Sequence, residues 1–535
     1  MRSLTHACKF LLPLVASSLC FAAQPDRITG PIDSSRMVEL ARSLHPKALP
    51  QFDQGPVDPA MQLTYMTMLM APSPAEQQAL DALLAQQQDR TSPKYHKWLT
   101  PQQFANQFGL SQRDLNKVVG WLQSEGFEIL STGGGRNSIS FSGTAVQVQH
   151  AFGAEIHNYT ILGKKYFANS TPLLIPAALN GIVHTVMGVH SFLPHRSGYF
   201  RTPRAAQASH PYYYSSQYGN FLAPGDIATI YDINPLYTAS TPIDGAGEQL
   251  AIVGQTDVYL DDINDFRSDF GLNPISGCST SDGMVTATSC NTTYFKYVVV
   301  GTDTGQIWNC GDLGESDLDL EWSGAVAQAA QIVFVNAPVT YNNSTACDIT
   351  SGGGVTAALT AVIDPSSGPP LAPVVSMSYG ACESESGSLE TLLLQGNAEG
   401  VTIFNAAGDV GAAECDFNPP NTTLPYDGAV GGLAVSYPAS SPEVTGVGGT
   451  EITIANDFPP SSYWGTTNGT NGGSVLSYIP EIEWNDDVEI AQYCQQYYSG
   501  NDFCLQGGSP AVEGWVALEA SATAEQVQQL SLIHI

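Results

Sequence analysis

Two acidic residues four positions apart, Glu315 and Asp319, are the first candidates for chemistry in this 535-residue chain. They lie in the helix-like segment GESDLDLEWSGAVAQAA, where this spacing places both carboxyl groups on one face, within reach of each other. Two like acids so placed cannot both ionise freely, so the pair can share a proton and act as base and then as acid. Taken alone, the spacing is far more often a solvated acidic helix face. Asp317 and Glu321 lie off the shared face, and we expect them to contact solvent.

If these acids are catalytic, they must work without imidazole. From Pro211 to Ile533 the chain contains no histidine and only two basic residues, Arg267 and Lys296. Histidine is the usual general base because its pKa lies near neutrality. A histidine-free hydrolase performs the same proton transfers with carboxylates, and a glutamate is suited to that task in acid. The sequence therefore predicts an acid-acting catalyst.

A third acid, Asp409, lies in FNAAGDVG at 404–411, directly after an apolar run and inside a glycine turn. In a parallel sheet, sites lie outside the carboxyl ends of the strands, which is where this position falls. An aspartate beside glycine is also a common turn residue, and for Asp409 considered alone this alternative is the commoner one.

The elements that must position these acids lie beyond Gly225, where buried-strand runs alternate with amphipathic stretches such as SLETLLLQGNAEG at 388–400. Continuous apolar strands with helical connections are typical of a parallel sheet covered by helices on both faces, so we predict an α/β catalytic domain. The strand runs are QLAIVG (249–254), AQIVFVNAP (330–338), APVVSMSYG (372–380), VTIFNAAGD (401–409) and EVTGVGGTE (443–451).

The N-terminal part has a different order of elements. LTYMTMLM at 63–70 is strand-like, and helices are expected after Ser73 and Ser111, which have the residue type and the setting of N-caps. Two further short strands flank a glycine turn at 133–135. This mixture predicts a compact α+β domain with an antiparallel sheet, ending near His190.

The first 22 residues have the pattern of a secretory signal. Arg2 and Lys9 precede an apolar run at 10–21 that is too short to span a bilayer, and small residues suit cleavage after Ala22. We therefore expect a secreted, extracellular protein.

Eight cysteines remain after that cleavage, and an even number in an exported chain favours disulfides over metal ligation, so no metal site is predicted in this chain. Proximity suggests the pairs Cys278–Cys290 and Cys494–Cys504. The eight are Cys278, Cys290, Cys310, Cys347, Cys382, Cys415, Cys494 and Cys504.

Charge divides the chain into two unlike parts. Residues 1–205 contain 17 Lys and Arg against 12 Asp and Glu, a net +5, whereas residues 206–535 contain 2 against 38, a net −36. The acidic part repels nucleic acid and anionic lipid, so we expect neither nucleic acid nor membrane as a partner, and we expect a monomer. A mildly basic N-terminal part should bind an acidic partner domain near neutrality and weaken as carboxylates protonate.

Several blocks resemble one known family. GESDLDLE, NAAGDVG and YPASSPEVTGVGGTE are similar to the corresponding blocks of the sedolisin, or serine-carboxyl peptidase, family, and SPKYHKWLTPQQF at 92–104 resembles its kumamolisin-type activation domain. The resemblance covers roughly residues 50–530, and several blocks in the family's order are far more specific than one motif. It implies a subtilisin-like catalytic fold preceded by a ferredoxin-like prodomain. It also implies a secreted zymogen that hydrolyses protein or peptide substrates and is inhibited by its own prodomain.

The resemblance further implies roles for single residues. Glu315 matches the general base, Asp319 the acid that orients it, and Asp409 the aspartic acid of the oxyanion hole. The last role requires a protonated carboxyl group, since COOH donates a hydrogen bond to an oxyanion whereas a carboxylate repels it. In the family, the substrate backbone pairs along a strand edge that forms one wall of the primary specificity pocket. The residues of this chain that match this edge are Ser378, Tyr379 and Gly380.

The sequence also departs from the family. Tyr379 stands where many members have tryptophan, and Gly254 and Gln255 stand where some have a glutamate, so a proton network behind the acids is expected to be absent. No SGTSA-like block, which holds the family's nucleophilic serine, occurs, and Ser521 has the setting of a helix N-cap. The family's later aspartate-rich calcium site is missing too, so calcium is expected only in the complete protein. We therefore expect a C-terminally truncated, inactive chain with a non-native tail at 531–535.

These observations divide the chain into six segments and leave two alternatives open. The alternatives are a non-catalytic relative that binds peptides and an acidic secreted adhesion module, although an adhesion module would not need a prodomain. The segments are a signal peptide (1–22), a polar lead (23–50), the activation prodomain (51–192), an exposed linker (193–218), a truncated catalytic domain (219–530) and the tail (531–535).

Overall fold

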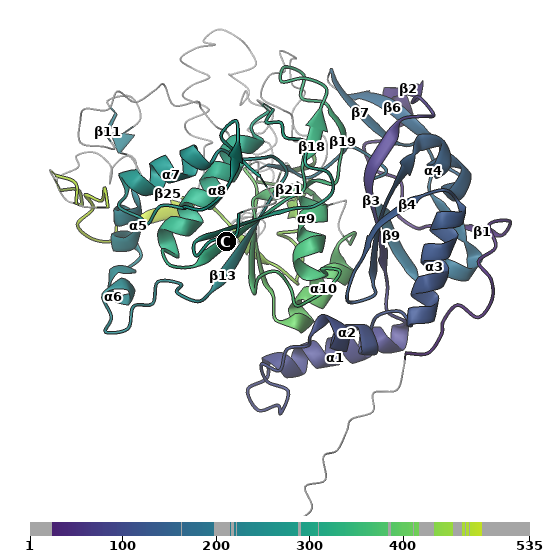
Figure 1. Cartoon of the computed structure of the whole chain (residues 1–535), viewed down its shortest axis with the longest axis horizontal. Helices are drawn as coiled ribbons and strands as arrows, with labels where there is room; N and C mark the ends of the chain where they lie inside the picture. The colour runs from purple at the N-terminus through teal and green to yellow at the C-terminus, as the bar shows by residue number, and fades with distance from the viewer. Residues whose placement is uncertain are drawn as a thin grey trace, which may run out of the picture.

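The structure is a computed structural model, shown for the whole chain in Figure 1. The predicted signal peptide and tail, most of the predicted linker, and the Cys494–Cys504 pair lie outside the residues that it describes. None of the helices in the described part has the length and apolar composition that crossing a membrane requires. The described residues are 24–161, 163–196, 214–215, 219–220, 222–286, 290–308, 310–383, 387–409, 411–412, 414–416, 433–452, 463–465, 467–469 and 471–483.

The N-terminal domain is built on a four-stranded antiparallel sheet with the strand order β4–β5–β3–β9. Met66, Val118 and Phe141 are among the side chains that form its core. The βαββαβ order along the chain is the ferredoxin-like arrangement that the resemblance implies. In chain order the elements are β3 (Gln62–Met70), α3 (Gln112–Ser124), β4 (Glu128–Thr132), β5 (Ser138–Thr144), α4 (Ala145–Phe152) and β9 (Val183–Met187).

Capping residues determine where the helices of this domain begin. The side chain of Ser73 accepts a hydrogen bond from a first-turn amide of α1 (Pro74–Gln88), and Ser111 does the same for α3, so both predicted N-caps are confirmed. Helix α2 (Pro101–Gln107) was not predicted from the sequence. Its N-cap, Thr100, forms a reciprocal capping box, which is a signal that could have revealed this short helix.

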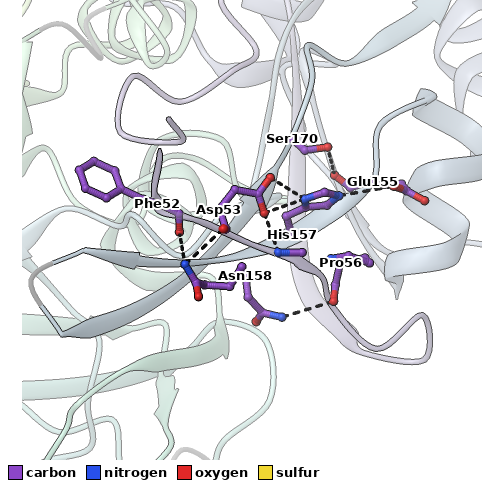
Figure 2. Close-up of polar contacts among 9 residues, drawn as sticks. Phe52, Asp53, Pro56, Glu155, His157, Asn158 and Ser170 are labelled. Carbon is purple, nitrogen blue, oxygen red and sulfur yellow. Dashed lines mark hydrogen bonds and ion pairs between the residues drawn. The ribbon is translucent and has the colours of Figure 1, made fainter. Parts of the chain in front are cut away.

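A smaller antiparallel sheet of the same domain is tied together by a histidine between two acids. Figure 2 shows the His157 imidazole between Asp53 and Glu155: Nδ1 lies 2.8 Å from Asp53 Oδ2, and Nε2 lies 3.4 Å from Glu155 Oε2. Because Asp53 and His157 come from neighbouring strands, the contact links the edges that pair in this sheet. The strands are β2 (Asp53–Pro56), β6 (Ile156–Ile161) and β7 (Lys164–Asn169).

The second domain, which the sequence predicts to be the catalytic domain, contains a six-stranded sheet in which every neighbouring pair is parallel. Ala251 and Val253 of its strand β13 pack with helices α9 and α10, whereas Ile252 packs with α7 and α8 on the other face. The predicted α/β class with helices on both faces is therefore confirmed (Figure 1). In sheet order the strands are β16 (Phe295–Val299), β17 (Gln331–Asn336), β13 (Gln249–Gly254), β20 (Val374–Met377), β22 (Thr402–Ala406) and β24 (Thr445–Val447), and the helices are α7 (Leu260–Asp269), α8 (Asp312–Val326), α9 (Gly354–Ile363) and α10 (Glu390–Glu399).

Disulfides and short elements complete the described chain. Cys278 pairs with Cys290, as predicted, and the structure adds the pairs Cys310–Cys347 and Cys382–Cys415. The short elements are β1 (Met37–Glu39), η1 (Pro50–Phe52), β8 (Leu174–Pro176), η2 (Ala177–Leu179), β10 (His195–Arg196), β11 (Tyr214–Ser215), β12 (Gly219–Asn220), α5 (Pro224–Ile230), α6 (Asn234–Tyr237), β14 (Thr280–Ser281), β15 (Met284–Val285), β18 (Val339–Tyr341), β19 (Ile349–Gly352), β21 (Tyr379–Cys382), η4 (Glu414–Asp416), β23 (Ser436–Tyr437), β25 (Thr450–Ile452) and β26 (Glu481–Glu483).

The N-terminal domain packs on helices α9 and α10 of the catalytic domain (Figure 1). Tyr65 and Leu69 of β3 belong to the same hydrophobic core as these helices. At the end of α10, the Leu99 amide and the Gln87 side chain both donate hydrogen bonds to the Ala398 carbonyl, at 2.9 and 3.0 Å. The block at 92–104 that resembles the activation domain is therefore part of the contact between the domains.

A glycine turn and a buried carboxylate make a second contact between the domains. Asp364, at the end of α9, accepts hydrogen bonds from the Gly135 amide and the Ser138 hydroxyl, both at 2.6 Å. A Cβ atom on Gly133 would overlap the Asp364 carboxylate, so this turn requires glycine for close approach.

Candidate active site

Helix α8 presents the two candidate catalytic acids to the carboxyl ends of the central strands. Gly254, the last residue of β13, lies against Ser316 of this helix. Ser378, directly after β20, donates a hydrogen bond from Oγ to Asp319 Oδ1 at 2.8 Å. Glu315 is buried and Asp319 is half-buried. The spacing of four therefore places both acids on the helix face that meets the sheet.

Burial and mutual repulsion keep a proton on this pair. Burial is the main cause that raises the pKa of Glu315; Asp319 and Asp409 raise it further, and the guanidinium of Arg196 opposes the rise. Burial also raises the pKa of Asp319, against the hydrogen bond that it accepts from Ser378. Glu315 Oε2 and Asp319 Oδ2 have no hydrogen-bond partner within the described residues. The pair therefore holds a proton under conditions in which an exposed glutamate is ionised.

Asp409 approaches the pair from the neighbouring end of β22. It is half-buried in a turn that begins with Gly408, whose φ of +84° lies in the left-handed region that favours glycine. It is close enough to Glu315 for its charge to raise the pKa of that residue. The structure thus brings the three predicted acids, Glu315, Asp319 and Asp409, to one end of the sheet, and their catalytic roles remain predictions.

The predicted substrate edge is occupied by the chain's own linker. Strand β10 pairs antiparallel with β21, with His195 opposite Gly380 and Arg196 opposite Tyr379. Ser378, the first residue of the predicted edge, bonds Asp319. The Tyr379 side chain is fully buried, and its hydroxyl donates a hydrogen bond into the domain interior, to Asp312. The backbone of this edge therefore pairs with the linker, and the Tyr379 ring lies behind it.

The linker also brings positive charge to the acids. His195 Nε2 lies 3.1 Å from Glu414 Oε1, and the Glu414 side chain is almost fully buried. The Arg196 guanidinium lies against Gly311, directly before α8, and it opposes the rise in the pKa of Glu315. The linker therefore brings the Arg196 guanidinium near Glu315 and places a histidine against Glu414, while its backbone fills the strand edge.

Asp312 is a site residue that the sequence analysis missed. It is the first residue of α8, is 3% exposed, and accepts hydrogen bonds from Gln255, Tyr341 and Tyr379. The replacements at Gln255 and Tyr379 predicted that a proton network behind the acids is absent. The structure shows where these two side chains lie: both donate to a carboxylate contributed from another position, Asp312.

Asp317 and Glu321 do not lie in solvent, contrary to the sequence analysis. Both are half-buried, because helix α7 packs on the face of α8 that carries them. Burial raises the pKa of Asp317 to about 7, and repulsion by Asp262 of α7 adds to the rise. Burial also raises the pKa of Glu321 to about 8, with further repulsion from Asp317 and Asp262. A helical period separates the two faces of α8 correctly, but it does not reveal what packs on each face.

Comparisons with known proteins agree with this architecture. The sequence profile of the pro-kumamolisin activation domain matches residues 52–192, and the profile of the subtilase family matches residues 301–514. Sedolisin of Pseudomonas sp. (strain 101) is 25% identical, with 89% of this chain and 76% of its own length aligned. Kumamolisin of Bacillus sp. (strain MN-32) is 25% identical, with 84% of this chain and 73% of its own length aligned.

A third relative is longer than the aligned part. Xanthomonalisin of Xanthomonas sp. (strain T-22) is 27% identical over 442 residues, which cover 77% of this chain and 50% of its own length. The chain therefore spans about half the length of this relative.

Proposed function

Because the chain belongs to the sedolisin family of serine-carboxyl peptidases and carries a kumamolisin-type activation domain, we propose that it is the zymogen of a secreted, acid-acting endopeptidase. The observation that supports this proposal most is the approach of Glu315, Asp319 and Asp409 at one end of the parallel sheet. From Pro211 to Ile533 the sequence has no histidine that could serve as base. The acids are then the groups that can move protons there.

In the proposed reaction, Glu315 takes the proton of a serine hydroxyl while the serine oxygen attacks the carbonyl carbon of the peptide bond. Asp319 orients Glu315 through the proton that the two carboxyl groups share. Glu315 then returns the proton to the leaving amine, and water releases the acyl group by the same steps in reverse order. Asp409, as COOH, donates a hydrogen bond to the oxyanion, so the rate falls as rising pH ionises it.

The nucleophilic serine belongs to a block that this sequence does not contain. We therefore assign peptidase activity to the complete protein, and we expect the 535-residue chain to form no acyl intermediate. Calcium is likewise proposed only for the complete protein. The described residues contain no group of three or more His, Cys, Asp or Glu side chains that could hold a metal ion, so no calcium ligand is assigned among them.

The proposed inhibition follows from the position of the linker. Strand β10 pairs with β21 along the edge where an extended peptide substrate would add as a strand. Burial is the largest cause of the raised pKa of Glu315, so the covered residue keeps its proton and cannot act as a base. Removal of the linker takes away the Arg196 guanidinium, which raises this pKa, and admits water, which lowers it. Release of the base requires the effect of water to be the larger one, so that Glu315 can ionise in acid. Substrate exclusion and a protonated base then act together.

Hydrolysis of casein by the complete protein at about pH 3–4, where carboxylates titrate, tests the proposal. Glu315→Gln should reduce kcat by about 100-fold or more, as expected for the loss of a general base. Glu321→Gln is the matched control, because it changes the same residue type on the other face of α8 and should retain activity. Full activity of Glu315→Gln, or cleavage by the 535-residue chain, would contradict the assignment. If the complete reading frame lacks the nucleophilic serine, the alternative of a non-catalytic relative that binds peptides is favoured.

A further inference from the structure

Asp312 is a buried carboxylate held by three uncharged side chains. Gln255 Nε2 and the Tyr379 hydroxyl donate hydrogen bonds to Oδ1, each at 3.1 Å, and the Tyr341 hydroxyl donates to Oδ2. The three donors come from different strands: Gln255 follows β13, Tyr341 ends β18 and Tyr379 begins β21. The carboxylate therefore ties the first turn of α8 to three strand ends at once.

This attachment lies next to the proposed catalytic pair. Asp312 precedes Glu315 by three residues and Asp319 by seven, so the three acids share one face of the helix. Tyr379, which bonds Asp312, is the chain neighbour of Ser378, which bonds Asp319. The helix face is thus fixed to one strand segment at two points, and Glu315 lies between them.

The charges around Asp312 change when the prodomain and linker leave. The cations that act on it are Arg196 of the linker and Lys164 of the prodomain hairpin β6–β7. Glu315 is the neighbouring acid, and its pKa is raised in part by the charge of Asp312. Gln255, Tyr341 and Tyr379 are uncharged donors from the catalytic domain itself, so they remain when both cations have gone.

We propose that Asp312 is a positioning residue for the catalytic pair: its three hydrogen bonds fix the first turn of α8 against the strand ends, one turn before Glu315. This inference rests on the proposed function of Glu315, but it concerns a different residue. Asp312 takes no proton from the substrate. It sets the orientation of the base, and its negative charge, when it is ionised, makes Glu315 retain its proton more strongly. Burial raises the pKa of Asp312 as well. Gln255 and Tyr379, the residues at the two replaced positions, thereby take part in a hydrogen-bond network around the carboxylate of Asp312.

Titration of the Glu315 carboxyl group in the full 535-residue chain tests this inference, because it needs no nucleophile. The carboxyl carbons are labelled with ¹³C-glutamate, and the Glu315 signal is assigned by its loss in Glu315→Gln. Asp312→Asn should lower the titration midpoint of Glu315 by about one pH unit, a tenfold change in proton affinity. Asp317→Asn is the matched control: it removes one charge from the same helix, on the face toward α7, and should move the midpoint by less than a third of that amount.

A second variant keeps the test decisive if Asp312→Asn does not fold. Tyr341→Phe removes one donor and leaves the carboxyl group in place. Loss of the Tyr341 donor favours the protonated form of Asp312. Asp312 then repels the Glu315 carboxylate less, so the Glu315 midpoint should fall in the same direction by a smaller amount. A merely structural role would lower the melting temperature and leave the midpoint unchanged. Equal shifts in Asp312→Asn and Asp317→Asn, or no shift in Tyr341→Phe, would overturn the inference. If the midpoint shifts but the complete protein cleaves no casein, the proposed function fails while the coupling stands.

Discussion

Replacing Asp364 with alanine should detach the N-terminal domain from the catalytic domain. Asp364 is 4% exposed and accepts hydrogen bonds from Gly135 and Ser138 of the N-terminal domain, both at 2.6 Å, and from Gln395 of its own domain at 3.1 Å. In Asp364→Ala the Gly135 amide and the Ser138 hydroxyl would remain buried without an acceptor. Each such loss costs about 1–3 kcal/mol.

Part of this cost is offset in the variant, because no carboxylate has to be buried. Burial raises the pKa of Asp364, which shows that removing its charge from water is unfavourable. We therefore expect a net loss of about 2–4 kcal/mol in docking free energy, or roughly 30- to 1,000-fold in affinity. Asp364→Asn keeps the size and one acceptor oxygen, so it should lose less than Asp364→Ala.

The dissociation rate of the two domains measures this effect. A specific protease site is introduced between residues 197 and 213, the chain is cut there, and release of the N-terminal domain is followed by size-exclusion chromatography. Asp269→Ala, which removes one exposed acid from α7, is the charge-matched control and should dissociate like the unchanged chain. Release from Asp364→Ala within twofold of the unchanged chain would refute the reasoning.

The same residue influences how docking depends on pH. Because burial in the docked state raises the pKa of Asp364, the docked state holds this proton more tightly than the separated domain does. This contribution strengthens docking as pH falls and is lost as pH rises through the docked pKa. The attraction between residues 1–205, with a net charge of +5, and residues 206–535, with a net charge of −36, acts the other way, since it fades as carboxylates protonate. Asp364→Asn should therefore show steeper acid release between about pH 7 and 4, whereas a dissociation constant that is unchanged over that range in both proteins would exclude charge-driven release.

Two further predictions concern stability. Ser73→Ala should lower the free energy of unfolding of the N-terminal domain by about 1 kcal/mol, because the capping box of α1 is lost, and Ser35→Ala at an exposed turn should not; denaturant titration compares the two. Burial and neighbouring acids raise the pKa of Asp317 to about 7 and that of Glu321 to about 8. The folded state is therefore more stable below these pH values, where both acids are protonated, and less stable above them, where the ionised acids repel each other. Asp317→Asn should therefore raise the melting temperature more at about pH 8 than at about pH 5, and an equal rise at both would contradict the assigned repulsion.

The sheet of the catalytic domain was predictable because its central strands are continuous apolar runs. QLAIVG at 249–254 coincides with the bounds of β13, since both faces of this strand are buried and nearly every position had to be apolar. Strand β16 was not predicted: it lies at the sheet edge and begins FK, so its apolar signal is weaker. The short helix α2 likewise has few periodic positions, and only its cap distinguishes it from a loop.

The site was predictable to the extent that it is local. The spacing of Glu315 and Asp319 places both on one helix face whatever the rest of the fold does. The approach of Asp409 depends on which strand lies beside which, and that follows from packing across the whole sheet. His195 and Arg196 pair with the β21 edge, which lies almost two hundred residues further along the chain. No local sequence pattern predicts such a pairing.

The expected loss of the network behind the acids shows most clearly where position-by-position reasoning stops. Gln255 and Tyr379 were each judged by the residue type at that position alone, which leaves an amide and a phenol without a carboxylate. Both are hydrogen-bond donors, however, and a buried pair of donors at the end of a sheet requires an acceptor. Asp312 meets that requirement from the start of α8, where the positive end of the helix dipole also favours a carboxylate. What the fold requires is a hydrogen-bond acceptor at one point in space, and the chain can supply it from any element that reaches that point.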